Sequence, residues 1–286
     1  MLQVARLAPR ALAEAAPRVE DYLRSQWAPG GGAMDRSGKP DLYYTAFFLD
    51  ALVALSADLP VDEARAYLAQ FGDGEELDLV HRACLVRCYA ALGQGWPSET
   101  FVPSIVEHLA QCRSGDGGFA LEPGREAGTL YDAFLALGIY QDVGIPMPAP
   151  AVLGASFETL RSRDGGFANQ ADLPWGTAPS TAAAVAVLTQ LEMPAPPEVG
   201  PWLLTQVHPK GGFKAMPEAP MPDLLSTATT LHALAILRQD FSVVSEACLD
   251  FLDTLWSGQS FHGHWADDDL DCEYTFYALL ALGHLA

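Results

Sequence analysis

Basic residues are scarce in this chain of 286 residues. Lysine and arginine together number 16, against 36 aspartates and glutamates, so the formal net charge is −20. This deficit argues against nucleic acids and anionic membrane surfaces as partners, because both are bound through a basic face. Half of the residues are hydrophobic. That fraction is enough for a folded core and excludes wholesale disorder.

Long apolar runs are also missing. No run approaches the roughly 18 residues that a membrane-spanning helix requires, and the longest clean stretch covers only residues 182–188. The first residues include Arg6, Arg10 and Glu14, and they lack the continuous apolar segment of a secretory signal. The five cysteines form no CxxC pair. We therefore expect reduced thiols and a cytoplasmic protein that does not span a membrane.

No alternating strand pattern stands out, but the chain contains an internal repeat. A glycine-rich turn recurs, most clearly as DGGFA at 116–120 and 164–168 and as KGGFK at 210–214. Apolar helical segments begin on a shared register at Asp41, Asp78, Gly128, Thr177, Asp223 and Asp271. The first and last of these starts lie 230 residues apart across five intervals, a mean spacing of 46 residues. The spacing predicts six repeats.

The pattern of each repeat predicts two helices with different surroundings. The first is amphipathic, as in Val19, Tyr22 and Leu23, whereas the second is apolar nearly all round, as in residues 182–188. An open array of repeats would need polar ends, yet the last helix, at 274–285, is as apolar as the middle ones. We therefore predict one all-α domain over residues 1–286, an α/α toroid of six helical hairpins around a central cavity.

Repeated Asp-Gly-Gly-Phe turns before apolar helices resemble the repeat of the prenyltransferase and squalene-cyclase superfamily. That superfamily includes the β subunits of protein prenyltransferases and the class II terpene cyclases. The resemblance covers nearly the whole chain and implies an α/α toroid that handles isoprenoids. It is less specific for the reaction, since function depends on the site.

The first repeat resembles the diphosphate motif of protein prenyltransferase β subunits, Arg-x-x-Lys-x-x-Asp-x-Cys-Tyr-Ser. The stretch here runs from Arg36 to Thr45 and is one residue shorter. The resemblance implies that Arg36, Lys39 and Tyr44 bind an isoprenoid diphosphate. It also implies a separate partner subunit, because those β subunits work with one.

The same resemblance bears on a metal. Asp41 falls on a zinc ligand of that family and His81 on its zinc histidine, but the cysteine position holds Tyr43. Catalytic zinc usually needs three protein ligands, so Asp41 and His81 are expected as polar site residues and zinc is doubtful. The acidic run at 267–271 resembles a magnesium motif, because Mg²⁺ prefers carboxylate oxygens. The cofactor stays undetermined.

The sixth repeat resembles the class II cyclase motif Asp-x-Asp-Asp-Thr, whose middle aspartate is the proton donor. It reads Asp271-Cys272-Glu273-Tyr274-Thr275, so Glu273 falls on the donor and Tyr274 on the last aspartate. The other repeats have Tyr43, Val80, Leu130, Pro179 and Leu225 there. A glutamate desolvated in an apolar cavity would have a raised pKa, as a general acid requires, and Asp271 could tune it.

Structural roles compete with each of these assignments. Aspartates at helix starts are favoured as N-caps, and His81 could be a hydrogen-bonded core histidine. Aromatic side chains could line an isoprenoid cavity or simply pack, namely Phe48, Tyr131, Trp175, Trp265 and Tyr274. The leading hypothesis is a prenyltransferase that binds an isoprenoid diphosphate in the cavity. The alternatives are a terpene cyclase with Glu273 as acid and a non-catalytic module that binds a lipid or a protein.

Overall fold

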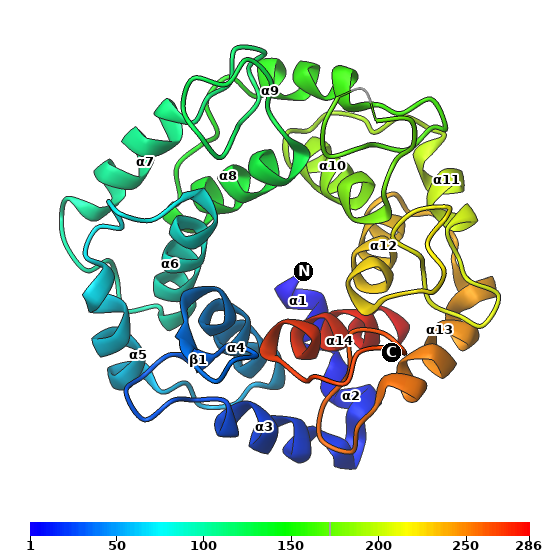
Figure 1. The fold of residues 1–286 in the computed structure, drawn as a ribbon, viewed down its shortest axis with the longest axis horizontal. Helices are drawn as coiled ribbons and strands as arrows, with labels where there is room; N and C mark the ends of the chain where they lie inside the picture. The colour runs from blue at the N-terminus through cyan, green and yellow to red at the C-terminus, as the bar shows by residue number, and fades with distance from the viewer. Residues whose placement is uncertain (172) are drawn as a thin grey trace.

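Helices in two concentric rings make up the computed structural model, which describes residues 1–171 and 173–286. The prediction of an all-α toroid is confirmed (Figure 1). The inner ring consists of α4 (Leu42–Leu55), α6 (Leu79–Leu92), α8 (Leu130–Val143), α10 (Ala178–Gln190), α12 (Leu224–Ile236) and α14 (Cys272–Leu285). The outer ring consists of α3 (Ala16–Ser25), α5 (Val61–Leu68), α7 (Phe101–Gln111), α9 (Pro150–Ser156), α11 (Val199–Thr205) and α13 (Ser242–Leu255).

The inner ring is closed. Each inner helix packs against the next one along the chain, and the last, α14, packs against the first, α4. Two short helices, α1 (Leu2–Ala5) and α2 (Ala8–Leu12), precede the rings and pack on α14 and α4. Figure 1 shows α1 reaching into the middle of the ring. In the described part of the chain, no helix is long and apolar enough to cross a membrane.

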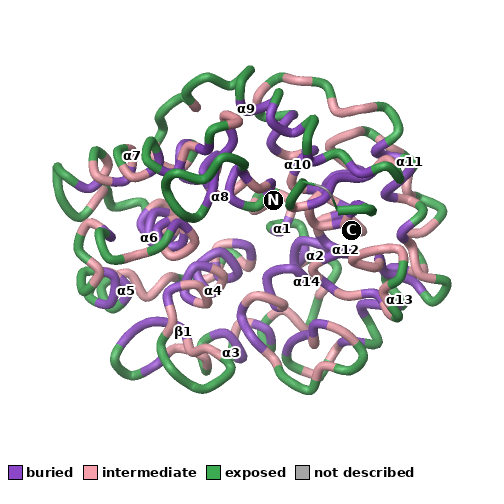
Figure 2. Tube along the Cα trace, turned by 45° about the horizontal axis from the view of Figure 1, so that its top comes forward, coloured by how far each residue is buried: buried purple, intermediate pink, exposed green. Residues whose placement is uncertain are grey.

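The inner helices and the connecting loops differ in how far their residues are buried. Figure 2 shows buried residues along the inner helices and exposed residues on the loops that connect the rings. All five cysteines are buried free thiols. Short 3₁₀ turns continue some helices, at Ala13–Ala15, Ala69–Phe71 and Phe157–Leu160. Strands β1 (Ala33–Met34) and β2 (Pro40–Asp41) pair antiparallel in the first connection, and they are too short to produce an alternating sequence pattern.

Every inner helix begins after a side-chain N-cap. The cap accepts a hydrogen bond from the backbone N–H three residues later, and the caps are Asp41, Asp78, Thr129, Thr177, Asp223 and Asp271. This satisfies one of the free N–H groups of each helix start. In the third repeat, the helix start expected from the sequence is wrong by one residue, because the cap is Thr129 and not Gly128. Tyr131, rather than Leu130, therefore occupies the position that Glu273 has in the sixth repeat.

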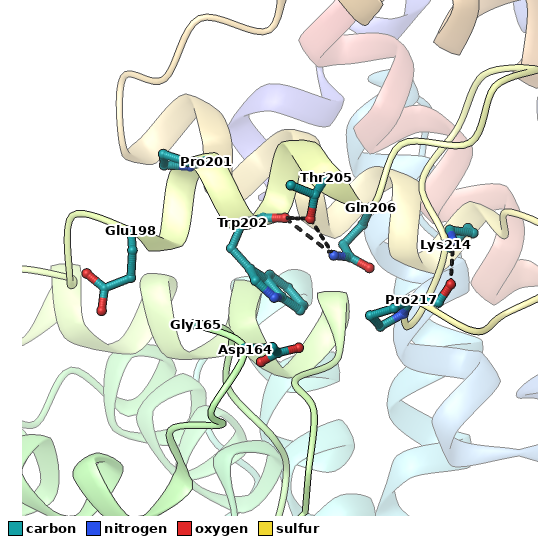
Figure 3. Close-up of a pocket in the computed structure, with 9 residues that line it drawn as sticks. All are labelled: Asp164, Gly165, Glu198, Pro201, Trp202, Thr205, Gln206, Lys214 and Pro217. Atoms are coloured by element: carbon teal, nitrogen blue, oxygen red, sulfur yellow. Dashed lines mark hydrogen bonds between the residues drawn. The ribbon is translucent and has the colours of Figure 1, made fainter.

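The glycine-rich turns allow neighbouring repeats to approach closely. An aromatic side chain of the next outer helix lies where a Cβ would otherwise stand, with Tyr67 over Gly32, Trp202 over Gly166 and Phe251 over Gly212. Figure 3 shows Trp202 of α11 beside the turn at Asp164 and Gly165. Two of these glycines, Gly32 and Gly212, also have positive φ angles, which glycine adopts without strain. The turns thus join consecutive repeats.

A threonine in the first turn of several inner helices fixes the preceding glycine-rich turn. Thr227 Oγ1 accepts a hydrogen bond from the backbone N–H of Phe213 (2.9 Å) and donates to the Asp223 carbonyl (2.7 Å). Thr45 and Thr181 accept equivalent bonds from Ala33 and Phe167. The recurring threonine of the sequence is therefore explained by a buried hydrogen bond.

We expect Thr227→Val to lower the free energy of unfolding by about 1–3 kcal/mol, because valine leaves the buried N–H of Phe213 without an acceptor. Chemical denaturation of the purified variant measures the loss. Thr229→Val is the matched control, since Thr229 Oγ1 bonds only to carbonyls of its own helix. Equal losses in the two variants would contradict this role of Thr227.

Candidate functional site

A cavity of about 760 Å³ lies at the centre of the ring. Its walls come from the inner helices, and Met1, Leu2 and Gln3 border it at the end where α1 lies. The volume is typical of sites that bind small molecules. The cavity therefore has the size and position expected of an isoprenoid site.

The wall side chains fall into three layers because helical periodicity brings residues spaced three, four and seven apart to one face. On α4 the cavity-lining residues include Tyr43, Phe47 and Asp50. On α6 they include Val80, Cys84 and Arg87. The first member of each set lies near the start of its helix, and the last lies about two turns further along it. We call the three levels the mouth layer, the middle layer and the floor.

The mouth layer contains the candidate acid. It consists of Tyr43, Val80, Tyr131, Leu225 and Glu273. The hydroxyl of Tyr43 donates a hydrogen bond of 2.8 Å to Glu273 Oε1. Burial raises the pKa of Glu273 to about 7; Asp271 adds to the increase, and the Tyr43 hydrogen bond and Arg36 oppose it. A substantial fraction of this carboxyl group is therefore protonated at neutral pH.

Aromatic rings dominate the middle layer. Phe47 lies with its ring centroid 5.8 Å from that of Phe276 and 5.6 Å from that of Tyr277, and Tyr43 lies 5.0 Å from Phe47. Phe134 of α8 lines the same space. Such rings bury hydrocarbon and present electron-rich faces to a positive charge. The middle layer thus suits an unsaturated hydrocarbon and a cation derived from it.

The floor is polar, which the sequence analysis missed. Arg87 of α6 donates from Nε to Asp50 Oδ2 on α4 and from Nη1 to Asp142 Oδ1 on α8, both at 2.9 Å. Gln190 and His232 line the cavity at the same end. A regular spacing of charged residues along the inner helices was the available signal, since Asp50 and Arg87 each lie nine residues after an N-cap aspartate.

Arg36 lies outside the cavity lining and is surrounded by carboxylates. Its Nε donates to Asp271 Oδ2 at 2.7 Å and its Nη2 to Asp267 Oδ2 at 2.9 Å, while Asp269 Oδ2 lies 3.7 Å from Nη1. The guanidinium carbon stands 5.4 Å from the centre of the Tyr274 ring. These contacts hold the acidic loop of the sixth repeat against the first repeat. They also occupy the carboxylates that resemble a magnesium motif.

The remaining predicted diphosphate and metal residues do not line the cavity. Lys39 is exposed, and Tyr44 packs edge-on against Tyr43 without lining the cavity. Asp41 caps α4, and His81 Nδ1 lies 2.8 Å from the Asp78 carboxylate. Within the described residues, no group of three or more His, Cys, Asp or Glu side chains could hold a metal ion. The side chains present therefore do not fit a catalytic zinc site.

Three predicted aromatic residues also lie away from the cavity. Phe48 is 1% exposed and stacks on Trp27 at 4.8 Å, on the outer side of α4. Trp175 is exposed in the loop before α10, and Trp265 is exposed while its Nε1 donates to Thr254. The cavity-facing aromatic residue of α4 is Phe47, one position earlier. Of the predicted substrate-binding residues, Tyr131 lines the cavity.

A second hollow lies on the outer wall of the ring. It measures about 450 Å³ and is lined by Asp164, Glu198, Trp202 and Lys214, among others (Figure 3). None of the residues proposed from the sequence as catalytic or substrate-binding lines it. It is formed where the turn of one repeat meets the outer helix of the next.

We expect Tyr43→Phe to raise the pKa of Glu273 by about one unit. The Tyr43 hydroxyl stabilises the carboxylate, so its removal favours the protonated form. A pH titration of the ¹³C-labelled Glu273 carboxyl by NMR measures the shift. Tyr131→Phe is the matched control, because that hydroxyl makes no hydrogen bond to Glu273 among the described residues. A pKa that is unchanged or lowered in Tyr43→Phe would contradict the assigned hydrogen bond.

Solved structures of known proteins have a fold similar to this ring of helices. The protein geranylgeranyltransferase-I of Candida albicans, complexed with GGPP, has a TM-score of 0.70 at 15% identity, over 92% of this chain and 89% of that one. A variant of the type II terpene cyclase MstE from Scytonema, in complex with its substrate geranylgeranyl dihydroxybenzoate, has a TM-score of 0.67 at 14% identity, over 97% of each chain. At these identities the likeness shows the fold alone.

Sequence comparisons give the family. A search of curated proteins found no significant match. The model of the prenyltransferase alpha-alpha toroid domain, however, matches residues 63–163 and 180–285, which is more than half of the chain. The protein therefore belongs to the prenyltransferase alpha-alpha toroid domain family.

Proposed function

We propose that the protein is an isoprenoid cyclase that begins its reaction by protonating a carbon–carbon double bond. The observation that carries this proposal is the position of Glu273. It stands in the wall of an apolar, aromatic cavity, at the site of the proton donor in the class II cyclase motif, and burial raises its pKa to about 7. A carboxylic acid that is partly protonated at working pH meets the first requirement of a general acid.

In the proposed reaction the substrate gains one proton and loses one proton. The O–H bond of Glu273 breaks and a C–H bond forms at one end of the double bond, which leaves a carbocation at the other end. A neighbouring double bond attacks the cation and closes a ring, and the final cation loses a proton. The product is an isomer of the substrate. Tyr43 stabilises the carboxylate that remains, and the aromatic middle layer stabilises the cation and excludes water.

Prenyl transfer from a diphosphate receives less support from this geometry. Arg36 is engaged by the carboxylates of Asp267 and Asp271, and Lys39 is exposed away from the cavity. Arg87 is the one Lys or Arg side chain in the described cavity lining, and it already bridges two carboxylates. A diphosphate would therefore lack the cluster of free cations that usually binds it. A partner subunit stays a prediction.

The proposal is tested by turnover in deuterated water. Purified protein is incubated with geranylgeraniol, with geranylgeranyl dihydroxybenzoate and with geranylgeranyl diphosphate, without added metal and with Mg²⁺ or Zn²⁺. We expect a cyclic isomer from a neutral substrate, one mass unit heavier because one deuterium is added and one proton is lost, with no metal requirement. Release of diphosphate with transfer of the prenyl group would instead support the prenyltransferase hypothesis.

Binding without any product under every condition would support the third hypothesis, a non-catalytic lipid-binding module. Isothermal titration calorimetry with the same three compounds makes that distinction. No binding of any of the three would contradict an isoprenoid site in the cavity.

A further inference from the structure

The floor of the cavity carries more polar groups than an isoprenoid hydrocarbon needs. Its side chains are two carboxylates, one guanidinium, a histidine and two amides, namely Asp50, Asp142, Arg87, His232, Gln141 and Gln190. They come from α4, α6, α8, α10 and α12, which lie side by side around the ring (Figure 1). Asp50 is buried, Arg87, Asp142 and His232 are partly buried, and Gln141 and Gln190 are exposed and bond to each other. A buried polar group is costly unless it finds a hydrogen-bond partner.

Several polar atoms of the floor have no partner within the described chain. Asp50 is 8% exposed, and its Oδ1 is buried without a hydrogen bond. Arg87 uses Nε and Nη1 on the two aspartates, which leaves Nη2 without a protein acceptor. Asp142 accepts only through Oδ1. The floor therefore keeps both donor and acceptor capacity next to a cavity that is large enough for a ligand.

The charge of the floor limits which ligand fits. Two carboxylates face one guanidinium, and burial raises the pKa of both carboxyls while Arg87 opposes the increase. Burial lowers the pKa of His232 to about 3, so its imidazole is neutral at pH 7. Arg87 is already paired with Asp50 and Asp142, so the floor offers an incoming anion no unpaired Lys or Arg side chain.

We propose that the floor is the binding site for the uncharged, hydrogen-bonding head group of the isoprenoid, such as an alcohol or phenol hydroxyl. This inference rests on the proposed function and names its substrate class. Arg87 Nη2 donates a hydrogen bond to the head-group oxygen, and the free Oδ2 of Asp142 accepts one from the head-group hydroxyl. A diphosphate is disfavoured because the only Lys or Arg side chain in the described cavity lining is already paired with Asp50 and Asp142.

The distance between the floor and Glu273 fits a substrate whose head group binds at the floor. Tyr43, which bonds to Glu273, and Asp50 are seven residues apart on α4, and a rise of 1.5 Å per residue separates them by about 10 Å. A chain whose head is held at the floor therefore extends across the aromatic middle layer toward Glu273. Its double bonds furthest from the head then lie nearest to the acid.

The test compares geranylgeraniol with geranylgeranyl diphosphate by isothermal titration calorimetry, on the full chain. We expect wild-type protein to bind the alcohol at least tenfold more tightly. Asp142→Asn removes one floor carboxylate and leaves the Arg87–Asp50 pair, so diphosphate affinity should rise at least tenfold relative to that of the alcohol. Asp21→Asn makes the same change of charge on the exposed face of α3 and should leave the ratio unchanged.

A second measurement needs no variant. In competition against geranylgeraniol, the corresponding hydrocarbon without its hydroxyl should bind at least tenfold more weakly to wild-type protein. Equal affinities for alcohol and hydrocarbon, or the same ratio in Asp142→Asn and Asp21→Asn, would overturn the head-group site. Those results would leave cyclisation by Glu273 standing on its isotope test, whereas no binding of any isoprenoid would overturn both proposals.

Discussion

Glu273→Gln should abolish turnover, with a loss of at least about a thousandfold in kcat, while substrate affinity changes by less than threefold. An amide cannot supply the proton that starts the reaction, and general acids contribute about 10²–10⁴-fold in enzymes. Glutamine keeps the size of the side chain and can still accept the Tyr43 hydroxyl bond. The loss should therefore fall on kcat, because the residue acts on the reacting atoms and not on the head group.

The measurement is product formation under single-turnover conditions, together with calorimetric binding. Glu246→Gln, on the exposed face of α13, is the matched control and should keep full activity. In wild-type protein, activity should decline about tenfold per pH unit above about pH 7, because Glu273 loses its proton there. A Glu273→Gln enzyme that retains a tenth of the wild-type rate would rule out Glu273 as the acid.

Glu273→Gln should also change how the free energy of unfolding depends on pH. The pKa of Glu273 is raised in the folded state from 4.5 to about 7, so the folded state holds a proton between those values that the unfolded state releases. The free energy of unfolding of wild-type protein therefore falls as pH rises through this window. Glutamine lacks this dependence, so the variant should gain up to about 3 kcal/mol relative to wild type between pH 4 and pH 8.

Gly211→Ala should cause the largest loss of stability among the glycine-rich turns, at least about 3 kcal/mol. A Cβ at this position would lie 1.7 Å from the carbonyl oxygen of Ala247 in α13, and φ is +87°. Neither backbone can move without separating the fifth turn from the outer helix of the sixth repeat. Steric clash and a disfavoured φ thus combine.

Gly258→Ala separates those two contributions. Gly258 has a φ of +98°, but nothing lies within 4 Å of its added Cβ, so only the backbone preference is lost, at about 1 kcal/mol. Urea denaturation of both variants measures the difference. If the two alanine variants lose equal stability, the close approach of turn and outer helix does not hold the repeats together.

Local and periodic features of the molecule could be predicted from the sequence alone. The recurring turn, the 46-residue spacing and the apolar second helices were sufficient for an α/α toroid, because each repeat must bury its apolar helix against its neighbours. The position of Glu273 near the start of an inner helix also followed from the shared register. Helix periodicity and N-capping act within a few residues, so a sequence displays them directly.

Only the closed ring decided which side chains meet. Arg36 reaches Asp271 across 235 positions of the chain, and Arg87 joins Asp50 and Asp142 from two other repeats. A rotation of one residue on α4 separates Phe47, which faces the cavity, from Phe48, which packs outward. The start of α8 lies one residue later than the sequence register predicts, which places Tyr131, rather than Leu130, in the mouth layer. These outcomes depend on helix rotation and ring closure, which are set by packing between distant segments. The sequence can show which residues share a helix position, but not which of them meet.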